Sequence, residues 1–489
     1  MAKVLILNPP SPDASYINRD LMGGMGVHNA PPGRGLRAKI IFKIKSITIH
    51  IPMMHLVNAA TALKQRGHDL RIIDAVNTGK DLNYVLKEAK AFGPAFIVTG
   101  VSSGCFKFER DEVARRLKEE IPGVKIIAAG DMITEMPQEL LPHFDYAIMG
   151  EVEQSIPAIV EGKPNNEIQS IIWQENGEVK KSEGGKQFIP VEELEKMQLP
   201  DWSLWPYKHY SYYPMLTKTP VALIQASRGC PYGCGYCPYP ANQGRLWRAR
   251  SAESVFEEVK WDAEKFGVKA IFFRDPLFTA NQERAEKLCD LIIQSGIRIQ
   301  FCFETRPELL NRPGLIEKLA KAGCRTINFG VEDIHPDILK QINRLPLPLD
   351  KIMETIHKCE KAGIRTSCFF IIGLPGSTKQ TMEETIAFSK KLFGSQTEYK
   401  IATPFPGTLL HKMAKEKGWL KHEGFDKLGS YSSSMRVSDE FDEKYLEELS
   451  ESSFVNYYFS PKYLFRYFMR GDFFTTLQTI IKAKMRGDF

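Results

Sequence analysis

The sequence predicts an α/β protein in which two runs of alternating strands and helices are followed by a C-terminal helical region. Short apolar strands separated by helices recur from residue 1 to about 165 and again from about 216 to 415, a pattern typical of parallel sheets covered by helices. A unit of helix end, glycine and strand also repeats forty residues apart, at 321–326 and 361–366. Such a repeat is typical of a barrel built from βα units.

The length of 489 residues exceeds what one hydrophobic core supports, so several domains are expected. We predict four segments: a doubly wound Rossmann-like domain at 1–165, a connector with a hairpin at 166–215, a partial (βα)6 barrel at 216–415, and a helical region at 416–489.

The first segment should contain five parallel strands, at 3–7, 69–74, 95–100, 124–129 and 146–149. Ligands of such sheets bind at the C-terminal strand ends. The long insertion at 11–50 interrupts this rhythm and is expected to be functional or disordered. In the connector, Asn176-Gly177 predicts a hairpin turn. The aromatic run at 202–213 either packs two domains together or lines a cleft between them.

The barrel should contain six strands, at 221–225, 269–275, 299–304, 326–331, 366–372 and 398–403. Catalytic groups of βα barrels gather at the C-terminal strand ends. The candidates there are Cys230, Cys234 and Cys237 after the first strand, Asp275 after the second, Arg306 after the third, Glu332 after the fourth and Gly373 after the fifth.

The three cysteines carry the most specific signal. Their CxxxCxxC spacing can hold three corners of an iron–sulfur cube and leave one iron open to a small molecule. The alternative is a structural zinc site, which usually takes four protein ligands. The next cysteine is Cys289 and the nearest downstream histidine is His335, so zinc is disfavoured. We expect the other six cysteines to be small buried hydrophobic residues.

The cysteine loop, with the aromatic Tyr236 before its last cysteine, resembles the signature of the radical S-adenosylmethionine (SAM) superfamily. The resemblance implies a 4Fe–4S cluster on the three cysteines and SAM chelated at the open iron. It further implies that Asp275 meets the amino group of SAM, Arg306 its carboxylate and Glu332 its ribose. The turn at Gly373 would then suit the adenine.

The first segment resembles the cobalamin-binding domain that precedes some radical SAM cores, in Asn8-Pro9-Pro10, Gly67-His68-Asp69 and Met149-Gly150-Glu151. The resemblance implies cobalamin contacts from Asn8, Ser102, Gly130, Thr134, Gly150 and Glu151. No DxHxxG motif is present, so no histidine is assigned below cobalt. The alternative is a Rossmann-like domain that binds nothing.

These resemblances imply a cobalamin-dependent radical SAM C-methyltransferase that acts on a small-molecule, lipid or chlorin-like substrate. The 5′-deoxyadenosyl radical would remove hydrogen from an unactivated carbon, and an external electron donor such as flavodoxin or ferredoxin would supply the electron. The alternatives are a cobalamin-dependent radical SAM cyclase or rearrangement enzyme, and a metal-binding module without enzymatic activity.

Charge and hydropathy restrict the partners and the location. A net charge of +6 is small for this length and does not suggest nucleic acid. Neither a signal peptide nor an apolar run of about 20 residues is present, so we expect a cytoplasmic protein. Residues 461–489 contain six Lys or Arg against two Asp. This tail either packs on the barrel with its charges in water or contacts an anionic membrane surface peripherally.

Overall fold

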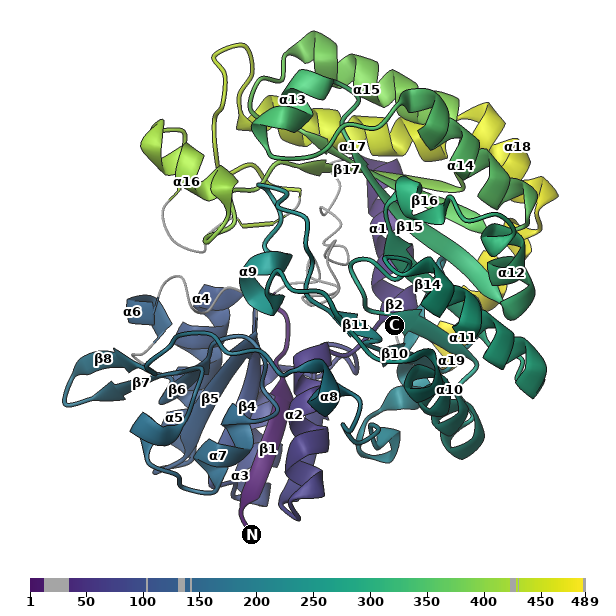
Figure 1. The fold of residues 1–489 in the computed structure, drawn as a ribbon. Coiled ribbons are helices and arrows are strands. Elements are labelled where there is room, and N and C mark those ends of the chain that lie inside the picture. Colours follow the sequence, from purple (N-terminus) through teal and green to yellow (C-terminus); the bar gives the residue numbers. More distant parts are fainter. Residues whose placement is uncertain are drawn as a thin grey trace.

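The computed structural model describes residues 1–12, 35–102, 104–130, 137–140, 143–422, 428–429 and 431–486. Two sheets dominate the fold, one from the N-terminal part of the chain and one from the part after residue 220. Helices cover both sheets, and the last helices lie against the second sheet (Figure 1). The α/β class predicted from the sequence is confirmed.

The first sheet has seven strands in the order β3-β1-β4-β5-β6-β7-β8. The strands are β1 (Lys3–Asn8), β3 (Asp69–Asp74), β4 (Phe96–Val101), β5 (Lys125–Gly130), β6 (Tyr146–Ile148), β7 (Ile171–Glu175) and β8 (Glu178–Lys181). The first five are parallel, as predicted. The hairpin expected at Asn176-Gly177 is β7–β8, and it extends this sheet in the antiparallel sense.

Alternate residues of β1 face opposite layers of helices. Val4 and Ile6 share a core with α2 and α7, whereas Leu5 and Leu7 share one with α3 and α5. The helices of this unit are α2 (Met54–Gln65), α3 (Leu82–Phe92), α4 (Phe106–Phe108), the π-helical turn Glu109–Ala114, α5 (Arg115–Glu120), α6 (Pro137–Leu140) and α7 (Ser155–Val160). Both faces of the sheet are therefore buried, which defines a doubly wound sheet.

The second sheet is a row of six parallel strands, β10-β13-β14-β15-β16-β17. They are β10 (Val221–Ile224), β13 (Ala270–Phe273), β14 (Gln300–Thr305), β15 (Cys324–Glu332), β16 (Arg365–Ile372) and β17 (Gln396–Ile401). The connecting helices are α9 (Tyr239–Gln243), α10 (Ala252–Phe266), α11 (Gln282–Ser295), α12 (Leu315–Ala322), α13 (Pro336–Gln341), α14 (Leu349–Lys361) and α15 (Lys379–Leu392). All six predicted strands are present, and the sheet does not close: β10 and β17 are its two edges.

Part of the predicted insertion is ordered structure that packs on the barrel. Residues of this segment form α1 (Leu36–Thr48) and β2 (Ile49–His50), and β2 pairs with β9 (Ser211–Tyr212) of the connector. The Lys45 ammonium of α1 bonds Glu398 of β17 at 3.0 Å. The segment at 13–34 lies outside the described residues.

The aromatic run of the connector packs the two units together. Trp202 is fully buried, and its indole N–H donates to Asp262 of α10 at 2.9 Å. Tyr212 stacks on Phe272 of β13 with ring centroids 4.5 Å apart. These rings belong to one hydrophobic cluster that also contains residues of β1 and α2, so the packing interpretation is confirmed.

A buried carboxylate at the end of β3 fastens the connector to the first sheet. Asp74 accepts hydrogen bonds from Asn8 (2.8 Å), from the Asn77 amide (2.9 Å) and from the Tyr210 hydroxyl (2.7 Å). Burial raises the pKa of Asp74, and the three donors oppose that shift by stabilising the charged form.

The C-terminal part adds four helices: α16 (Leu409–Glu416), α17 (Glu443–Tyr458), α18 (Pro461–Met469) and α19 (Asp472–Arg486). The helix α17 packs along β17, at one edge of the open barrel (Figure 1). Among the described residues, no helix combines the length and the apolar composition that crossing a membrane would require.

We expect Tyr210→Phe to lower the free energy of unfolding by about 1–3 kcal/mol, because the buried Asp74 carboxylate loses a hydrogen bond that nothing replaces. Urea unfolding followed by circular dichroism measures the change. The matched variant Tyr84→Phe, at an exposed position of α3, should keep the wild-type midpoint. Equal midpoints for Tyr210→Phe and the wild type would contradict the proposed contribution of this bond.

Candidate active site

The cysteine loop follows a strand and a turn that only glycine permits. Gly229 has a φ of +80°, and a Cβ atom there would lie 2.0 Å from the carbonyl oxygen of Leu246. Backbone hydrogen bonds hold the loop at both ends: Cys230 N–H donates to Gly244 at 3.1 Å and Gly235 N–H to Ile342 at 2.6 Å. The loop is therefore held in one conformation by backbone contacts.

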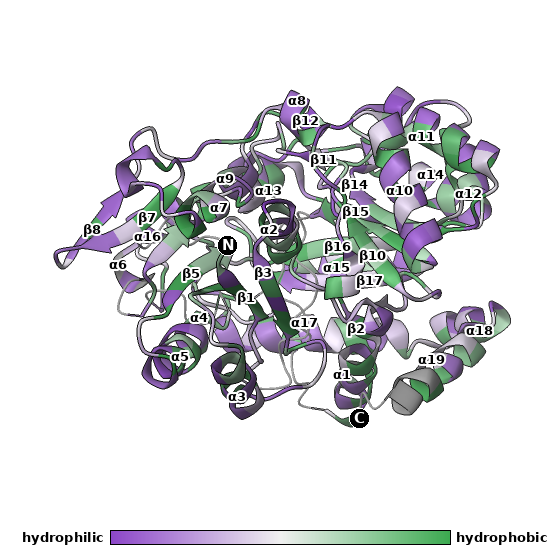
Figure 2. Ribbon diagram, turned by 90° about the horizontal axis from the view of Figure 1, so that it is seen from below, coloured by the Kyte–Doolittle hydropathy of each residue, from purple (hydrophilic) through white to green (hydrophobic). Residues whose placement is uncertain are grey.

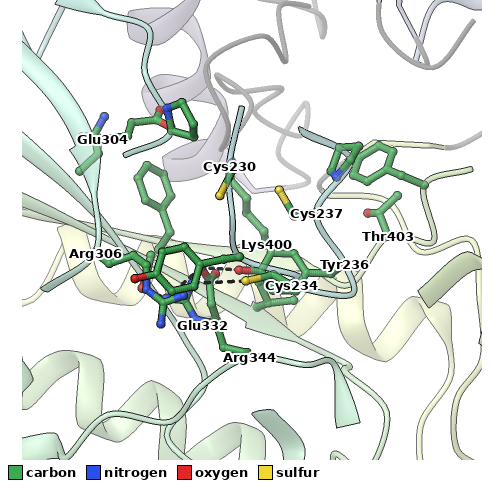
Figure 3. A pocket seen from close by; sticks show the side chains of 18 of the residues that line it. Cys230, Cys234, Tyr236, Cys237, Glu304, Arg306, Glu332, Arg344, Lys400 and Thr403 are labelled. Atoms are coloured by element: carbon green, nitrogen blue, oxygen red, sulfur yellow. Dashed lines mark hydrogen bonds and ion pairs between the residues drawn. The ribbon is translucent and has the colours of Figure 1, made fainter. Parts of the chain in front are cut away.

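The three cysteines line a cavity at the C-terminal ends of the barrel strands (Figure 3). The cavity holds about 990 Å³ of space, its open mouth included. Burial raises the pKa of Cys230 to about 11 and also raises that of Cys237. Among the described residues, no group of three His, Cys, Asp or Glu side chains converges closely enough for a single metal ion.

Arg306, at the end of β14, lines the same cavity. Its guanidinium lies 4.1 Å from the centre of the Tyr232 ring, and its Nε donates to Glu308. Both terminal nitrogens, Nη1 and Nη2, are buried without a hydrogen-bond partner among the described residues. Two parallel N–H donors of this kind match a carboxylate.

Glu332, at the end of β15, is the second charged group predicted from the sequence that reaches the cavity. Its Oε1 accepts a hydrogen bond from the Tyr236 hydroxyl at 2.7 Å, whereas its Oε2 has no partner among the described residues. Its φ of +69° is in the left-handed region, a strain that often marks functional sites. The Arg344 guanidinium lies 3.7 Å from Glu332 and 3.8 Å from the Cys234 sulfur.

Sequence reasoning missed Arg344, Asn328 and Lys400, which also line the cavity. Arg344 follows α13 rather than a strand, so no strand-end rule could find it. Asn328 and Lys400 lie within strands. The inward face of a barrel strand is a signal that could have found them, because side chains alternate between its two faces. Burial lowers the pKa of Lys400, and neighbouring glutamates, with Glu398 first, oppose this.

The unpartnered atoms match the polar parts of SAM. The Arg306 terminal nitrogens fit its carboxylate, and the Glu332 Oε2 and both amide atoms of Asn328 fit hydroxyl and amine groups. The three thiols that line the same cavity could supply three ligands to a cluster with one open iron. The residues present therefore fit both groups.

Two predicted residues lie apart from the cavity lining. The Asp275 carboxylate accepts from Ala226 N–H and from the Ser227 hydroxyl, both at 2.7 Å, and so braces the segment that leads into the cysteine loop. Gly373 has a φ of +76°, and a Cβ atom there would meet Leu446 of α17 at 2.9 Å. Neither is brought together with Arg306 and Glu332.

The candidates on the first sheet gather at its C-terminal edge. Asn8 bonds Asp74 but keeps its Oδ1 buried without a partner among the described residues. Ser102 bonds Glu109 through its N–H at 2.7 Å. A Cβ atom at Gly130 would lie 2.0 Å from the Val101 carbonyl oxygen, so this strand end stays without a side chain. Thr134 lies outside the described residues.

Glu151, predicted as a cobalamin contact, has a carboxylate that is occupied by protein partners. It is buried and bonds the Arg248 guanidinium at 2.8 Å and the Arg228 guanidinium at 3.4 Å, while Glu153 bonds Arg228 at 2.6 Å. Burial opposes the charge of Arg228, but Glu153 and Glu151 raise its pKa above the ordinary value. Glu151 thus ties the first sheet to the cysteine loop, since Arg228 lies two residues before Cys230.

An open barrel of six parallel strands with three cysteines after its first strand defines a radical SAM core. Residues 224–389, which contain the three cysteines and the strands β13 to β16, match the family model described as the radical SAM superfamily. The chain is 29% identical over 448 residues to an uncharacterized methyltransferase of Pyrococcus horikoshii, with 89% of this chain and 93% of the relative covered.

Two further relatives differ in the reaction that their names state. An anaerobic magnesium-protoporphyrin IX monomethyl ester cyclase of Cereibacter sphaeroides is 24% identical, over 84% of this chain and 68% of the relative. A bacteriochlorophyllide d C-8(2)-methyltransferase of Chlorobaculum tepidum is 22% identical, over 77% of this chain and 79% of the relative.

The fold is also that of a solved cobalamin-dependent radical SAM enzyme. The radical SAM methyltransferase TsrM of Kitasatospora setae, solved with cobalamin and a 4Fe–4S cluster, superposes with a TM-score of 0.66 at 19% identity. The match covers 86% of this chain and 80% of TsrM. The predicted pairing of a cobalamin-binding type of domain with a radical SAM barrel is confirmed at the level of the fold.

We expect the triple variant Cys230→Ala, Cys234→Ala, Cys237→Ala to lose all bound iron and acid-labile sulfide while keeping the wild-type circular dichroism spectrum. The three residues lie on a loop held by its backbone, so their loss leaves the main core unchanged. The matched variant Cys289→Ala removes a buried thiol of α11 and should retain the iron. Formation of 5′-deoxyadenosine by the triple variant would contradict the assignment.

Proposed function

We propose that the protein is a cobalamin-dependent radical SAM enzyme that methylates an unactivated carbon of a small molecule. The observation that carries the proposal is the cavity in which three cysteines face the unpartnered polar atoms of Arg306 and Glu332. The relatives named as methyltransferases and the fold shared with TsrM support it.

When bound, a 4Fe–4S cluster with SAM supplies a 5′-deoxyadenosyl radical that removes hydrogen from carbon, and cobalamin supplies the transferred methyl group. In the proposed site, Arg306 binds the SAM carboxylate and Glu332 accepts hydrogen bonds from the ribose hydroxyls. Tyr236 and Arg344 orient Glu332 through a hydrogen bond and an ion pair.

The first sheet is positioned to present cobalamin to this cavity. Phe405 lines the cavity and also packs against the hydrophobic core of the first sheet. Gly150 follows β6 with a φ of +96°, and a Cβ atom there would lie 3.2 Å from the carbonyl oxygen of Asn242 in α9. We place the corrinoid at the C-terminal edge of the first sheet, where Asn8 keeps a buried Oδ1 without a partner among the described residues.

The cavity lining indicates the substrate class. Phe369, Ile371, Ile401 and Phe405 form an apolar wall, which fits a largely apolar substrate such as a chlorin or a lipid. The cluster requires one electron from outside, so an external donor such as flavodoxin or ferredoxin belongs to the proposal. Such donors and the nine free cysteines suit the reducing cytoplasm.

A cyclase or rearrangement enzyme is the second candidate. The relative named as an anaerobic magnesium-protoporphyrin IX monomethyl ester cyclase favours it, because that relative covers 84% of this chain. The two candidates share the cysteines and the SAM-binding groups, and they differ in whether a methyl group enters the product.

We expect Arg306→Lys to weaken SAM binding about 10–100-fold, because lysine keeps the charge but loses the forked pair of donors. Equilibrium dialysis of SAM against the anaerobically prepared holoprotein measures this affinity, and the cluster absorbance should stay unchanged. Arg312→Lys, at an exposed ion pair of the barrel surface, is the matched control. Unchanged SAM affinity in Arg306→Lys would refute the carboxylate assignment.

Methyl transfer itself is tested with SAM that carries a deuterated methyl group. We expect the holoprotein with cobalamin and a reductant to convert a chlorin or lipid acceptor into a product that contains the deuterated methyl, detected by mass spectrometry. Protein prepared without cobalamin should make no such product. A product that has lost hydrogen but carries no deuterated methyl group would contradict methylation and support the cyclase instead.

A further inference from the structure

The helices α18 and α19 are amphipathic in the opposite sense to ordinary surface helices. A helix that packs on a protein normally buries its apolar face and exposes its polar face. Here the polar side chains turn toward the barrel and the large apolar side chains turn to solvent. This arrangement requires a second apolar environment outside the described chain.

Polar contacts hold the inner face of the helix pair. Asp472 of α19 is buried and forms an ion pair with Arg365 at the start of β16. Thr476, one turn further, hydrogen-bonds the hydroxyl of Tyr213. From α18, Arg466 and Arg470 both bind Glu360, the latter at 2.6 Å. Burial favours protonation of Glu360, but the two guanidinium groups hold its pKa below the ordinary value, so the contact stays ionic.

The outer face of the pair is apolar and largely aromatic. Phe465 of α18 is 70% exposed and Met469 is 67% exposed. The helix α1 packs beside α19 (Figure 2). Its residues Leu36 and Ile40 are also exposed. We call the following set the apolar patch: Leu36, Ile40, Leu464, Phe465, Phe468, Met469, Phe473, Phe474, Leu477 and Ile481, all exposed.

Basic residues accompany the apolar patch, and acidic residues are nearly absent from its helices. The sequence of α18 and α19 contains five Lys or Arg, at 462, 466, 482, 484 and 486, of which Arg466 is paired with Glu360. Their single acid, Asp472, is neutralised by Arg365. Exposed Arg37 and Lys39 add positive charge from α1. Protein–protein interfaces are depleted in lysine, whereas lysine and arginine beside an aromatic face are typical of helices that lie on anionic membranes.

We propose that the apolar patch rests on the surface of an anionic lipid bilayer. The phenylalanines enter the boundary between headgroups and acyl chains, and exposed basic residues such as Arg37 and Lys39 meet the anionic headgroups. The contacts with Arg365 and Ser395 place α18 and α19 at the N-terminal ends of β16 and β17. The cavity lies at the opposite strand ends, so membrane contact leaves its mouth open.

The test is sedimentation of the anaerobically prepared holoprotein with vesicles of phosphatidylglycerol and phosphatidylcholine in equal amounts. We expect binding at low ionic strength that weakens as salt screens the headgroups, and little binding to phosphatidylcholine alone. The variant Phe465→Ser, Phe468→Ser, Phe474→Ser should bind at least about tenfold more weakly, because three exposed aromatic rings no longer enter the bilayer. It should keep the wild-type iron content, which confirms folding.

Tyr84→Ser is the matched control, because it removes an exposed aromatic ring on α3, far along the chain from the patch, and should bind vesicles like the wild type. Wild-type protein that stays in the supernatant with anionic vesicles would overturn the proposal. Equal binding by the triple variant would overturn it as well. A concentration-dependent dimer that the triple variant abolishes, without vesicle binding by the wild type, would assign the patch to a second copy instead.

Discussion

A buried network of two arginines and two glutamates is the constraint on which the active site depends. Arg228 and Arg248 flank the cysteine loop, and Glu151 and Glu153 reach them from the end of the first sheet. Buried ion pairs add little net stability, because desolvation offsets much of the attraction. Removing one partner, however, leaves a buried charge unpaired, which costs about 3–5 kcal/mol of folding free energy. The network therefore fixes how the two units are placed rather than how stable each one is.

That placement explains why the site is shared between the two units. The cysteine loop belongs to the barrel, yet the residues on either side of it are held by the first sheet. Phe405 joins the cavity to the core of the first sheet from the other side. A cofactor bound at the C-terminal edge of that sheet and a cofactor bound to the three cysteines would then face the same space. Such proximity is what a transfer between two bound groups requires.

The barrel presents two chemically different surfaces at its opposite ends. At the C-terminal strand ends, charged groups such as Arg306 and Glu332 are buried beside apolar walls, which suits recognition of a polar cofactor and an apolar substrate. At the N-terminal strand ends, the inverted helices α18 and α19 present aromatic rings to the outside. The membrane contact proposed for α18 and α19 would therefore leave the mouth of the cavity free.

The sequence alone determined the strands of both sheets, the cysteine loop and the cavity residues Arg306 and Glu332. Apolar periodicity and glycine caps are local signals, and side chains that directly follow parallel strands must meet at one edge. Only the tertiary structure decided which way other side chains point. The Asp275 carboxylate accepts a hydrogen bond from the Ala226 backbone, and Glu151 forms ion pairs with two arginines. Arg344, which follows α13, lines the cavity. A buried charged group is costly unless it is paired, and the partner that folding brings near it is distant in the sequence.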